Sequence, residues 1–176
     1  KISAFDATAQ SLKTQKTDTL ELAKEVYKYV QSNFTWDGNK YLFTQNPLKD
    51  IYNRKTGSGT ELNLLLISLL RQVGIEANPV VISTREHGRI WKEYPMITRF
   101  NYTLAHVKIK GKDVLLDVTD KNLRWGLLPS FCMVGEGRLL INNKSQWLPI
   151  RTPEKSGEMI NMEFTFGEKE SELESQ

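Results

Sequence analysis

The sequence predicts an α+β fold in which a buried helix packs on an antiparallel β-sheet. Two observations support this class: the first half of the chain holds two segments of helical periodicity, and the second half holds short runs of apolar residues separated by turn residues. Helices that precede a group of antiparallel strands are typical of α+β architectures. The 176 residues are enough for one domain with its own hydrophobic core.

The first helix is predicted over Thr19–Ser32. Asp18 precedes it as an N-cap, with Glu21 as the capping-box partner three residues later, and apolar side chains then recur at helical spacing. The residues before it are polar and show little periodicity, so residues 1–17 are interpreted as a loose lead-in. Residues 40–56 are also predicted to lack regular secondary structure, because Asn46-Pro47 and Asp50–Asn53 would interrupt a helix or strand.

The second helix follows Ser58 and ends before Gly74. Ser58 and Glu61 form a second capping box, and Gly74 is a stop signal just past the last turn. The residues between them are apolar almost all round, which predicts a helix in the middle of the domain rather than on its surface.

The remaining elements are predicted to be strands. Gly111 is expected to turn the second of them into an antiparallel hairpin with the third. The strands are expected at Pro79–Thr84, Phe100–Lys110, Val114–Thr119, Arg138–Ile141, Gln146–Ile150 and Met159–Phe166. Residues 18–166 are therefore taken as a single domain, and residues 167–176, with four glutamates and one lysine, as an acidic flexible tail.

Composition excludes several classes of function. One cysteine can form neither an internal disulfide nor a zinc cluster, and the sequence offers no metal site or cofactor motif. The net charge of +3 is too small to indicate nucleic-acid binding, and no apolar stretch is long enough to form a transmembrane segment. Because the chain begins at Lys1 without a methionine, we expect it to be a piece of a longer protein.

Several segments together resemble the transglutaminase-like (papain-like) domains of large exported bacterial proteins. The resemblance covers about Leu20–Ile150 and rests on the order of its motifs. These are Gly57-Ser58-Gly59-Thr60-Glu61 at the start of the central helix, Ala77–Arg85, Phe100-Asn101-Tyr102 and Leu115-Leu116-Asp117-Val118-Thr119. The resemblance implies the papain-like core as the fold.

The family uses a catalytic triad, and the resemblance implies that this chain has lost two of its members. In the family a cysteine heads the central helix, where the free N–H groups and the helix dipole lower its pKa. A histidine on the next long strand takes the proton, and an aspartate orients the histidine. Carried over to this chain, the cysteine position falls on Gly59, the histidine position on Tyr102 and the aspartate position on Asp117.

Other residues offer weak replacements for the missing groups. Ser58 lies beside the empty cysteine position but is expected to be used as the helix cap, and Cys132 is expected to be a buried apolar side chain. His106 lies four residues beyond Tyr102, too far for proton transfer, and is expected at the surface or a sheet edge. His87 is expected in a loop. A residual hydrolase or acyltransferase that uses Ser58 or Cys132 on a peptide or amide substrate remains the alternative.

Two hypotheses concern the space at the empty cysteine position. Gly59 could leave the helix N-terminus open to an anion, or Tyr102 could fill that space and cap the helix with its hydroxyl. The candidates for ligand contacts around a cleft are Ser58, Thr60, Trp36 and Trp125, although packing at the rim of the core is the favoured role for each tryptophan.

The function expected from the sequence is binding or scaffolding without catalysis. The candidate partners are neighbouring domains of the same polypeptide, a peptide or protein, or a cell-surface glycan. The resemblance alone implies a periplasmic, cell-surface or extracellular location.

Overall fold

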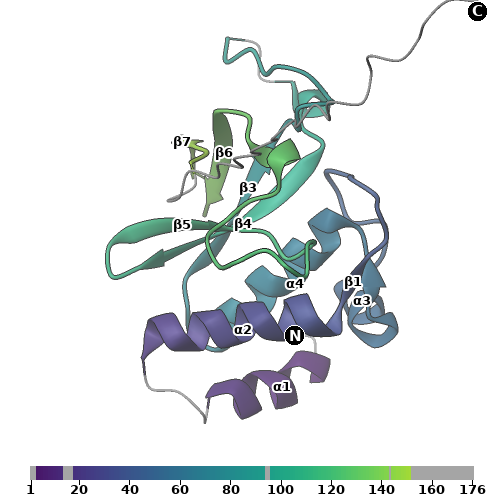
Figure 1. Ribbon diagram of the computed structural model, residues 1–176, viewed down its shortest axis with the longest axis vertical. Helices are drawn as coiled ribbons and strands as arrows, with labels where there is room; N and C mark the ends of the chain where they lie inside the picture. Colours follow the sequence, from purple (N-terminus) through teal and green to yellow (C-terminus); the bar gives the residue numbers. More distant parts are fainter. Residues whose placement is uncertain (1–2, 14–17, 94–95, 143, 152–176) are drawn as a thin grey trace, which may run out of the picture.

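The computed structural model describes residues 3–13, 18–93, 96–142 and 144–151. Helices lie against a five-stranded antiparallel sheet, so the α+β class and the central helix on a sheet are confirmed (Figure 1). None of the helices in these ranges is both long enough and apolar enough to cross a membrane.

Within the described residues, four α-helices and two short 3₁₀ segments form the helical part. The predicted helices are present: α2 begins after its Asp18 cap, and the Ser58 hydroxyl accepts from the Glu61 backbone N–H at the start of α4. Gly74 has a φ of +90° after the last turn of α4, as its role as a stop residue requires. The helices are α1 (Ser3–Lys13), α2 (Thr19–Asn33), α3 (Leu48–Arg54), α4 (Gly59–Gln72), η1 (Ile97–Arg99) and η2 (Ser130–Cys132).

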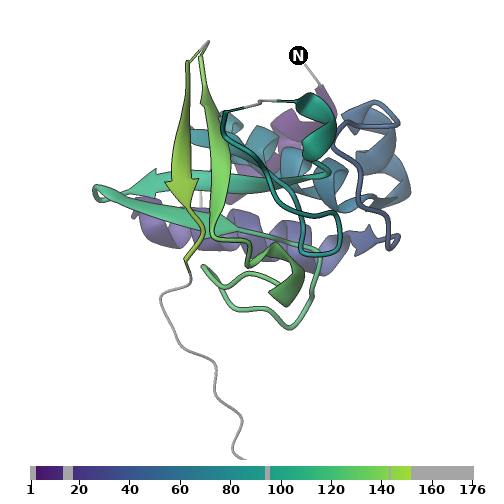
Figure 2. The ribbon, with the colours of Figure 1, turned by 90° about the horizontal axis from the view of Figure 1, so that it is seen from above.

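The main sheet has the strand order β5-β4-β3-β6-β7, with each neighbouring pair antiparallel. Lys110 and Gly111 both have positive φ and form the two-residue turn between β4 and β5. Figure 2 shows β6 and β7 as a hairpin that projects beyond the helical layer. The strands are β3 (Ala77–Ile82), β4 (Tyr102–Ile109), β5 (Lys112–Leu116), β6 (Glu136–Ile141) and β7 (Lys144–Pro149), and a separate parallel pair joins β1 (Thr35–Trp36) to β2 (Thr56–Gly57).

The sheet separates two clusters of buried apolar side chains. The larger cluster lies between α4, α2 and one sheet face, and α4 has five fully buried leucine positions, Leu62, Leu65, Leu66, Leu69 and Leu70. The smaller cluster lies on the opposite face, where Tyr102, Leu104 and Cys132 pack together. Because strand residues alternate between faces, Tyr102 and Asp117 come to neighbouring sites where β4 and β5 meet.

Two expectations about irregular segments are wrong. Residues 3–13 form α1, which packs on α4 and α2, and residues 48–54 form α3 with Ile51 fully buried. Both helices are short, and tertiary packing stabilises them where the periodicity in sequence is weak. The strand expected at Met159–Phe166 and the tail at 167–176 lie outside the described residues.

Candidate functional site

The residues at the three expected triad positions lie together at the N-terminus of α4. Gly59 is the first residue of the helix, directly after the Ser58 cap, and its backbone N–H donates to the Asn39 carbonyl at 3.1 Å. Tyr102 begins β4, and Asp117 follows β5. The side chains of Tyr102 and Asp117 are fully buried, and their hydroxyl and carboxylate oxygens are 2.7 Å apart.

The Tyr102 ring occupies the space that a side chain at position 59 would need. A Cβ atom on Gly59 would lie 2.7 Å from Tyr102 Cζ, and closer still to Cε2 and the hydroxyl oxygen. Such separations are not tolerated between non-bonded carbon atoms. The open anion site considered above is therefore wrong: Tyr102 fills the space, and the Gly59 N–H is already bonded.

Asp117 is held by neutral donors. One carboxylate oxygen accepts from the Tyr102 hydroxyl and from Asn63 Nδ2 at 2.8 Å, and the other accepts from the Thr119 backbone N–H at 3.0 Å and from the Thr119 hydroxyl. These hydrogen bonds satisfy both oxygens of the buried side chain.

Asn63 and Thr60 complete the site from within α4. Asn63 Nδ2 also donates to the Thr103 carbonyl at 2.9 Å, its Oδ1 accepts from the Val118 N–H at 3.1 Å, and the Thr60 hydroxyl accepts from the Thr103 N–H at 3.0 Å. The sequence analysis missed Asn63, although an amide inside a helix of leucines is a visible signal. Thr60 and Ser58 were expected as ligand contacts; both are buried and bonded to the backbone, so they offer no face to a ligand.

The environment keeps the phenol and the nearby thiol protonated. Burial and then the negative charge of Asp117 raise the pKa of Tyr102 well above its ordinary value. Burial, and then the negative charge of Asp117, also raise the pKa of the Cys132 thiol. Cys132 is fully buried in the smaller cluster, as expected for an apolar role.

An open groove of about 1410 Å³ lies next to the buried site. Thr119 and Phe131 separate the two: Thr119 bonds Asp117, and the Phe131 ring packs edge-on against Tyr102 with 5.4 Å between centroids. Trp36 stacks on Phe131 at 5.9 Å and also lines the groove. Trp125 instead packs edge-on against Tyr27 in the larger cluster at 5.5 Å.

The two histidines lie away from the site. His87 is exposed in the loop after β3 and contacts the Thr98 carbonyl at 3.1 Å. His106 was expected at the surface or a sheet edge, which is wrong: it is 3% exposed on β4, an inner strand, and its Nε2 lies 2.9 Å from Asp113 Oδ1. His106 lies opposite Asn78 of β3 and Leu115 of β5, pairings that the spacing in sequence alone does not reveal.

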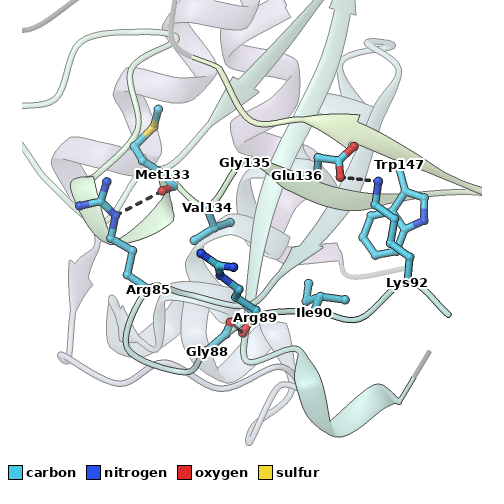
Figure 3. Close-up of a pocket in the computed structure, with 11 residues that line it drawn as sticks. Arg85, Gly88, Arg89, Ile90, Lys92, Met133, Val134, Gly135, Glu136 and Trp147 are labelled. Atoms are coloured by element: carbon cyan, nitrogen blue, oxygen red, sulfur yellow. Dashed lines mark hydrogen bonds and ion pairs between the residues drawn. The ribbon is translucent and has the colours of Figure 1, made fainter. Parts of the chain in front are cut away.

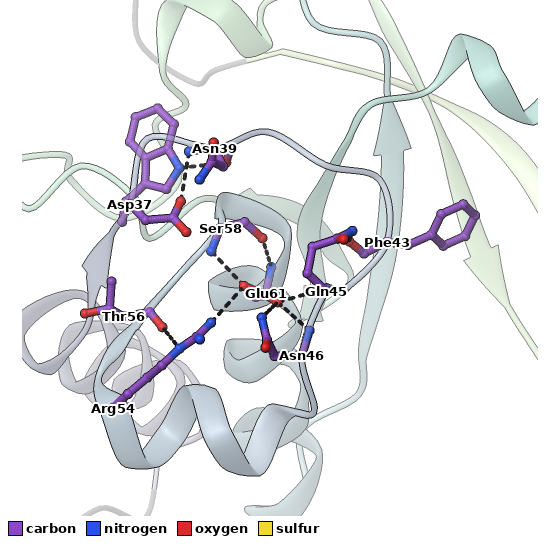
Figure 4. A network of polar contacts seen from close by, with 10 residues as sticks. Asp37, Asn39, Phe43, Gln45, Asn46, Arg54, Thr56, Ser58 and Glu61 are labelled. Atoms are coloured by element: carbon purple, nitrogen blue, oxygen red, sulfur yellow. Dashed lines mark hydrogen bonds and ion pairs between the residues drawn. The ribbon is translucent and has the colours of Figure 1, made fainter.

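Glu61 anchors the loop that precedes α3 to the start of α4 (Figure 4). One carboxylate oxygen accepts from the backbone N–H groups of Gln45 and Asn46, each at 3.0 Å, and the other accepts from the Ser58 N–H at 2.8 Å. Burial alone would raise the pKa of Glu61, but these backbone donors hold it below its ordinary value.

The Glu61→Gln variant should unfold more easily than the wild type at neutral pH, by about 1–3 kcal/mol, because charge-assisted bonds are lost. A carboxylate with a lowered pKa in the folded state stabilises the fold above its unfolded pKa, and this contribution disappears as the pH falls through the folded pKa. The difference from the wild type should therefore shrink in acid. Urea unfolding at neutral pH and in acid measures the difference in unfolding free energy. Glu93→Gln, in an exposed loop, is the control. An equal difference at both pH values would contradict the ionised network.

Comparison with known proteins gives the same fold. The structure resembles a candidate protease from Parabacteroides distasonis ATCC 8503, with 12% identity, a TM-score of 0.54, and coverage of 71% of this chain and 28% of that protein. It also resembles a candidate cysteine protease from Cytophaga hutchinsonii, with 14% identity, a TM-score of 0.50, and coverage of 67% and 37%. The chain thus spans well under half the length of either protein. No curated protein matches the sequence.

A sequence family matches a large part of the chain independently of these structures. The match covers residues 6–125, which include α1, α4 and the positions Gly59, Tyr102 and Asp117. The family is described as the transglutaminase-like superfamily. Because the match extends over more than half of the 176 residues and agrees with the fold, the chain belongs to the transglutaminase-like superfamily.

Proposed function

We propose that this chain is a catalytically inactive transglutaminase-like domain that acts as a binding or scaffolding module in a longer exported bacterial protein. One observation carries the proposal: the Tyr102 ring fills the space above Gly59, where the family resemblance places the nucleophile. The active-site region is therefore closed as well as chemically incomplete.

Acyl transfer requires a nucleophile and a base at these positions. Gly59 has no side chain. Tyr102 has a raised pKa and keeps its proton while its hydroxyl donates a hydrogen bond to Asp117, so it cannot accept a proton from a nucleophile at neutral pH. The remaining Asp117 has no histidine to orient and instead ties β4, β5 and α4 together through its hydrogen bonds.

The residual hydrolase is the weaker alternative, even though the two similar structures are candidate proteases. The Ser58 hydroxyl accepts from the helix backbone and is 1% exposed. The Cys132 thiol is fully buried and its pKa is raised, which opposes formation of the reactive thiolate. Neither side chain has a base within hydrogen-bond reach among the described residues.

The proposed location is periplasmic, cell-surface or extracellular. It is inferred from the family resemblance only. The greater length of the two similar proteins, of which this chain spans 28% and 37%, supports instead the proposal that the chain is part of a longer protein. Neighbouring domains of the same polypeptide, a peptide or protein, or a cell-surface glycan are the proposed classes of partner, and the groove beside Trp36 and Phe131 supplies a surface for them.

A panel of ester and amide substrates tests the inactivity. We expect no turnover above background, and no alkylation of Cys132 until the protein is unfolded, because its thiol is covered. Turnover that Cys132→Ala abolishes would overturn the proposal in favour of the rearranged hydrolase.

The matched gain-of-function variant combines Gly59→Cys, Tyr102→His and Cys132→Ala, so that only one thiol remains. The smaller imidazole removes the overlap at position 59 and restores the base, and the new thiol lies at a helix N-terminus. We expect its pKa, followed by ultraviolet absorbance of the thiolate, to fall below about 8.5. An ordinary thiol pKa would mean that the triad positions have been assigned to the wrong residues.

A further inference from the structure

Two adjoining pockets form one cationic surface on the side of the molecule that carries Phe131. A pocket of about 550 Å³ lies between the loop after β3 and the start of β6, and Figure 3 shows Arg89 reaching toward Val134 in it. It shares Arg85 and Met133 with the groove of about 1410 Å³ described above. We call the two together the basic strip. Its cationic residues are Arg85, Arg89, Lys92, Lys121, Arg124 and Arg151.

The positive charge of the basic strip is largely uncompensated. Its acidic lining residues are Asp120 and Glu136, and Glu136 is paired with Lys92 at 2.5 Å. The other five cationic side chains are exposed and form no ion pair with a described residue. Positive charges along a concave surface concentrate the field and attract an anionic partner.

The lining between these charges is apolar. In the larger groove, Trp36 and Phe131 form a stacked aromatic pair, and Leu127, Leu128 and Pro129 lie beside it. Arg85 Nε donates to the Met133 carbonyl at 3.3 Å, which orients the guanidinium where the two pockets join. Arginine binds carboxylates through paired hydrogen bonds, whereas the apolar lining favours aliphatic or aromatic side chains. Double-stranded nucleic acid, which presents mainly its phosphates, would leave this lining unused.

The chain itself contains a segment of the matching chemistry. Residues 152–176 follow directly after Arg151, which lines the basic strip, and they hold seven glutamates and two lysines. That segment carries a net charge of −5, so the preceding 151 residues carry +8. Its glutamates are interspersed with apolar residues, namely Met159, Ile160, Met162, Phe164 and Phe166.

We propose that the basic strip binds an extended, glutamate-rich peptide whose acidic residues alternate with apolar ones. This inference rests on the proposed function, since it assigns a ligand class to a groove that binds without catalysis. The occupant we assign is residues 152–176 of the same chain, because their attachment to Arg151 holds them at high effective concentration beside the basic strip.

Fluorescence anisotropy with a labelled synthetic peptide of residues 158–176 tests the proposal on the full chain. Arg89→Glu combined with Arg124→Glu should weaken binding about tenfold or more, because two attractive contacts become repulsive. Lys28→Glu combined with Lys112→Glu changes the net charge equally at exposed positions outside the basic strip and should leave affinity within about twofold. The same peptide with glutamine at every glutamate should not bind.

A variant with a neutralised tail tests whether residues 152–176 are the occupant. If they occupy the basic strip, the added peptide should bind severalfold more tightly once their competing charges are removed. Unchanged affinity would overturn residues 152–176 as the occupant, in favour of a separate acidic protein. The tail substitutions are Glu168→Gln, Glu170→Gln, Glu172→Gln and Glu174→Gln.

Three further results would overturn the proposal: equal loss in both charge-reversal pairs, equal binding of the glutamine peptide, or tighter binding of an oligonucleotide than of the peptide. Each of these would leave the proposed inactivity standing. Conversely, turnover that Cys132→Ala abolishes would refute the proposed inactivity, whether or not the peptide binds. Failure of the peptide proposal and failure of the proposed inactivity are therefore distinguishable.

Discussion

Gly59→Ala should destabilise the protein by about 2–4 kcal/mol, although alanine normally favours a helix over glycine by about 1 kcal/mol. The reason is steric. The new methyl group would lie 2.7 Å from Tyr102 Cζ and closer to two other atoms of the same side chain, which is fully buried and bonded to Asp117. Neither the ring nor the helix can move without breaking that bond or opening the core. Urea unfolding measures the loss.

The Tyr102→His background is the control for this prediction. A shorter ring leaves room for the methyl group, so Gly59→Ala should cost much less there or become neutral. The coupling free energy from the double-mutant cycle should be about 2 kcal/mol, in the range measured for residues in direct contact. Additive effects would show that the overlap at position 59 is relieved by some other adjustment.

Asn63→Leu should cost about 3–5 kcal/mol of unfolding free energy, despite the similar size of the two side chains. The substitution leaves the Thr103 carbonyl and the Val118 N–H without their partner and removes one donor from the buried Asp117. Buried polar groups that lose a partner cost more than the net value of the bond that held them. Chemical denaturation measures the loss, and Ser68→Leu at a partly exposed position of α4 is the control.

Asn63→Asp separates charge from shape at the same position. The introduced carboxylate would face Asp117 at hydrogen-bond distance, so it should be more destabilising than leucine at neutral pH. Burial and repulsion raise the pKa of the introduced carboxyl group above its unfolded value, so the penalty is relieved as the pH falls and that group takes up a proton. A stability difference from the wild type that does not shrink in acid would contradict this repulsion.

The helices and strands that the sequence predicted correctly are those with strong local signals. Capping residues marked α2 and α4, alternation marked β3 and β4, and the Gly111 turn fixed the register that brings Tyr102 to Asp117. The family and its motif order could also be recognised, because the segment around Gly59 combines a cap, a glycine and an apolar helix in a specific order.

The missed features depend on contacts between distant residues. α1 and α3 have weak periodicity and are stabilised by packing against α4, and the buried position of His106 depends on neighbours from other segments. Likewise, the position of Phe131 between Tyr102 and Trp36 joins three segments that no local pattern relates. The basic strip arises in the same way, since its cations come from the loops after β3, β5 and β7.

The overlap between position 59 and Tyr102 also limits how the gene can change. A single mutation that places cysteine at position 59 yields a chain with a side chain forced into an occupied space, and a single mutation to histidine at position 102 yields a base with no nucleophile. Under the proposed function, neither single step would supply both a nucleophile and a base, and the first lowers the fraction of folded protein. Any route from this sequence to the family's triad by single substitutions that begins at position 59 would therefore pass through a less stable protein.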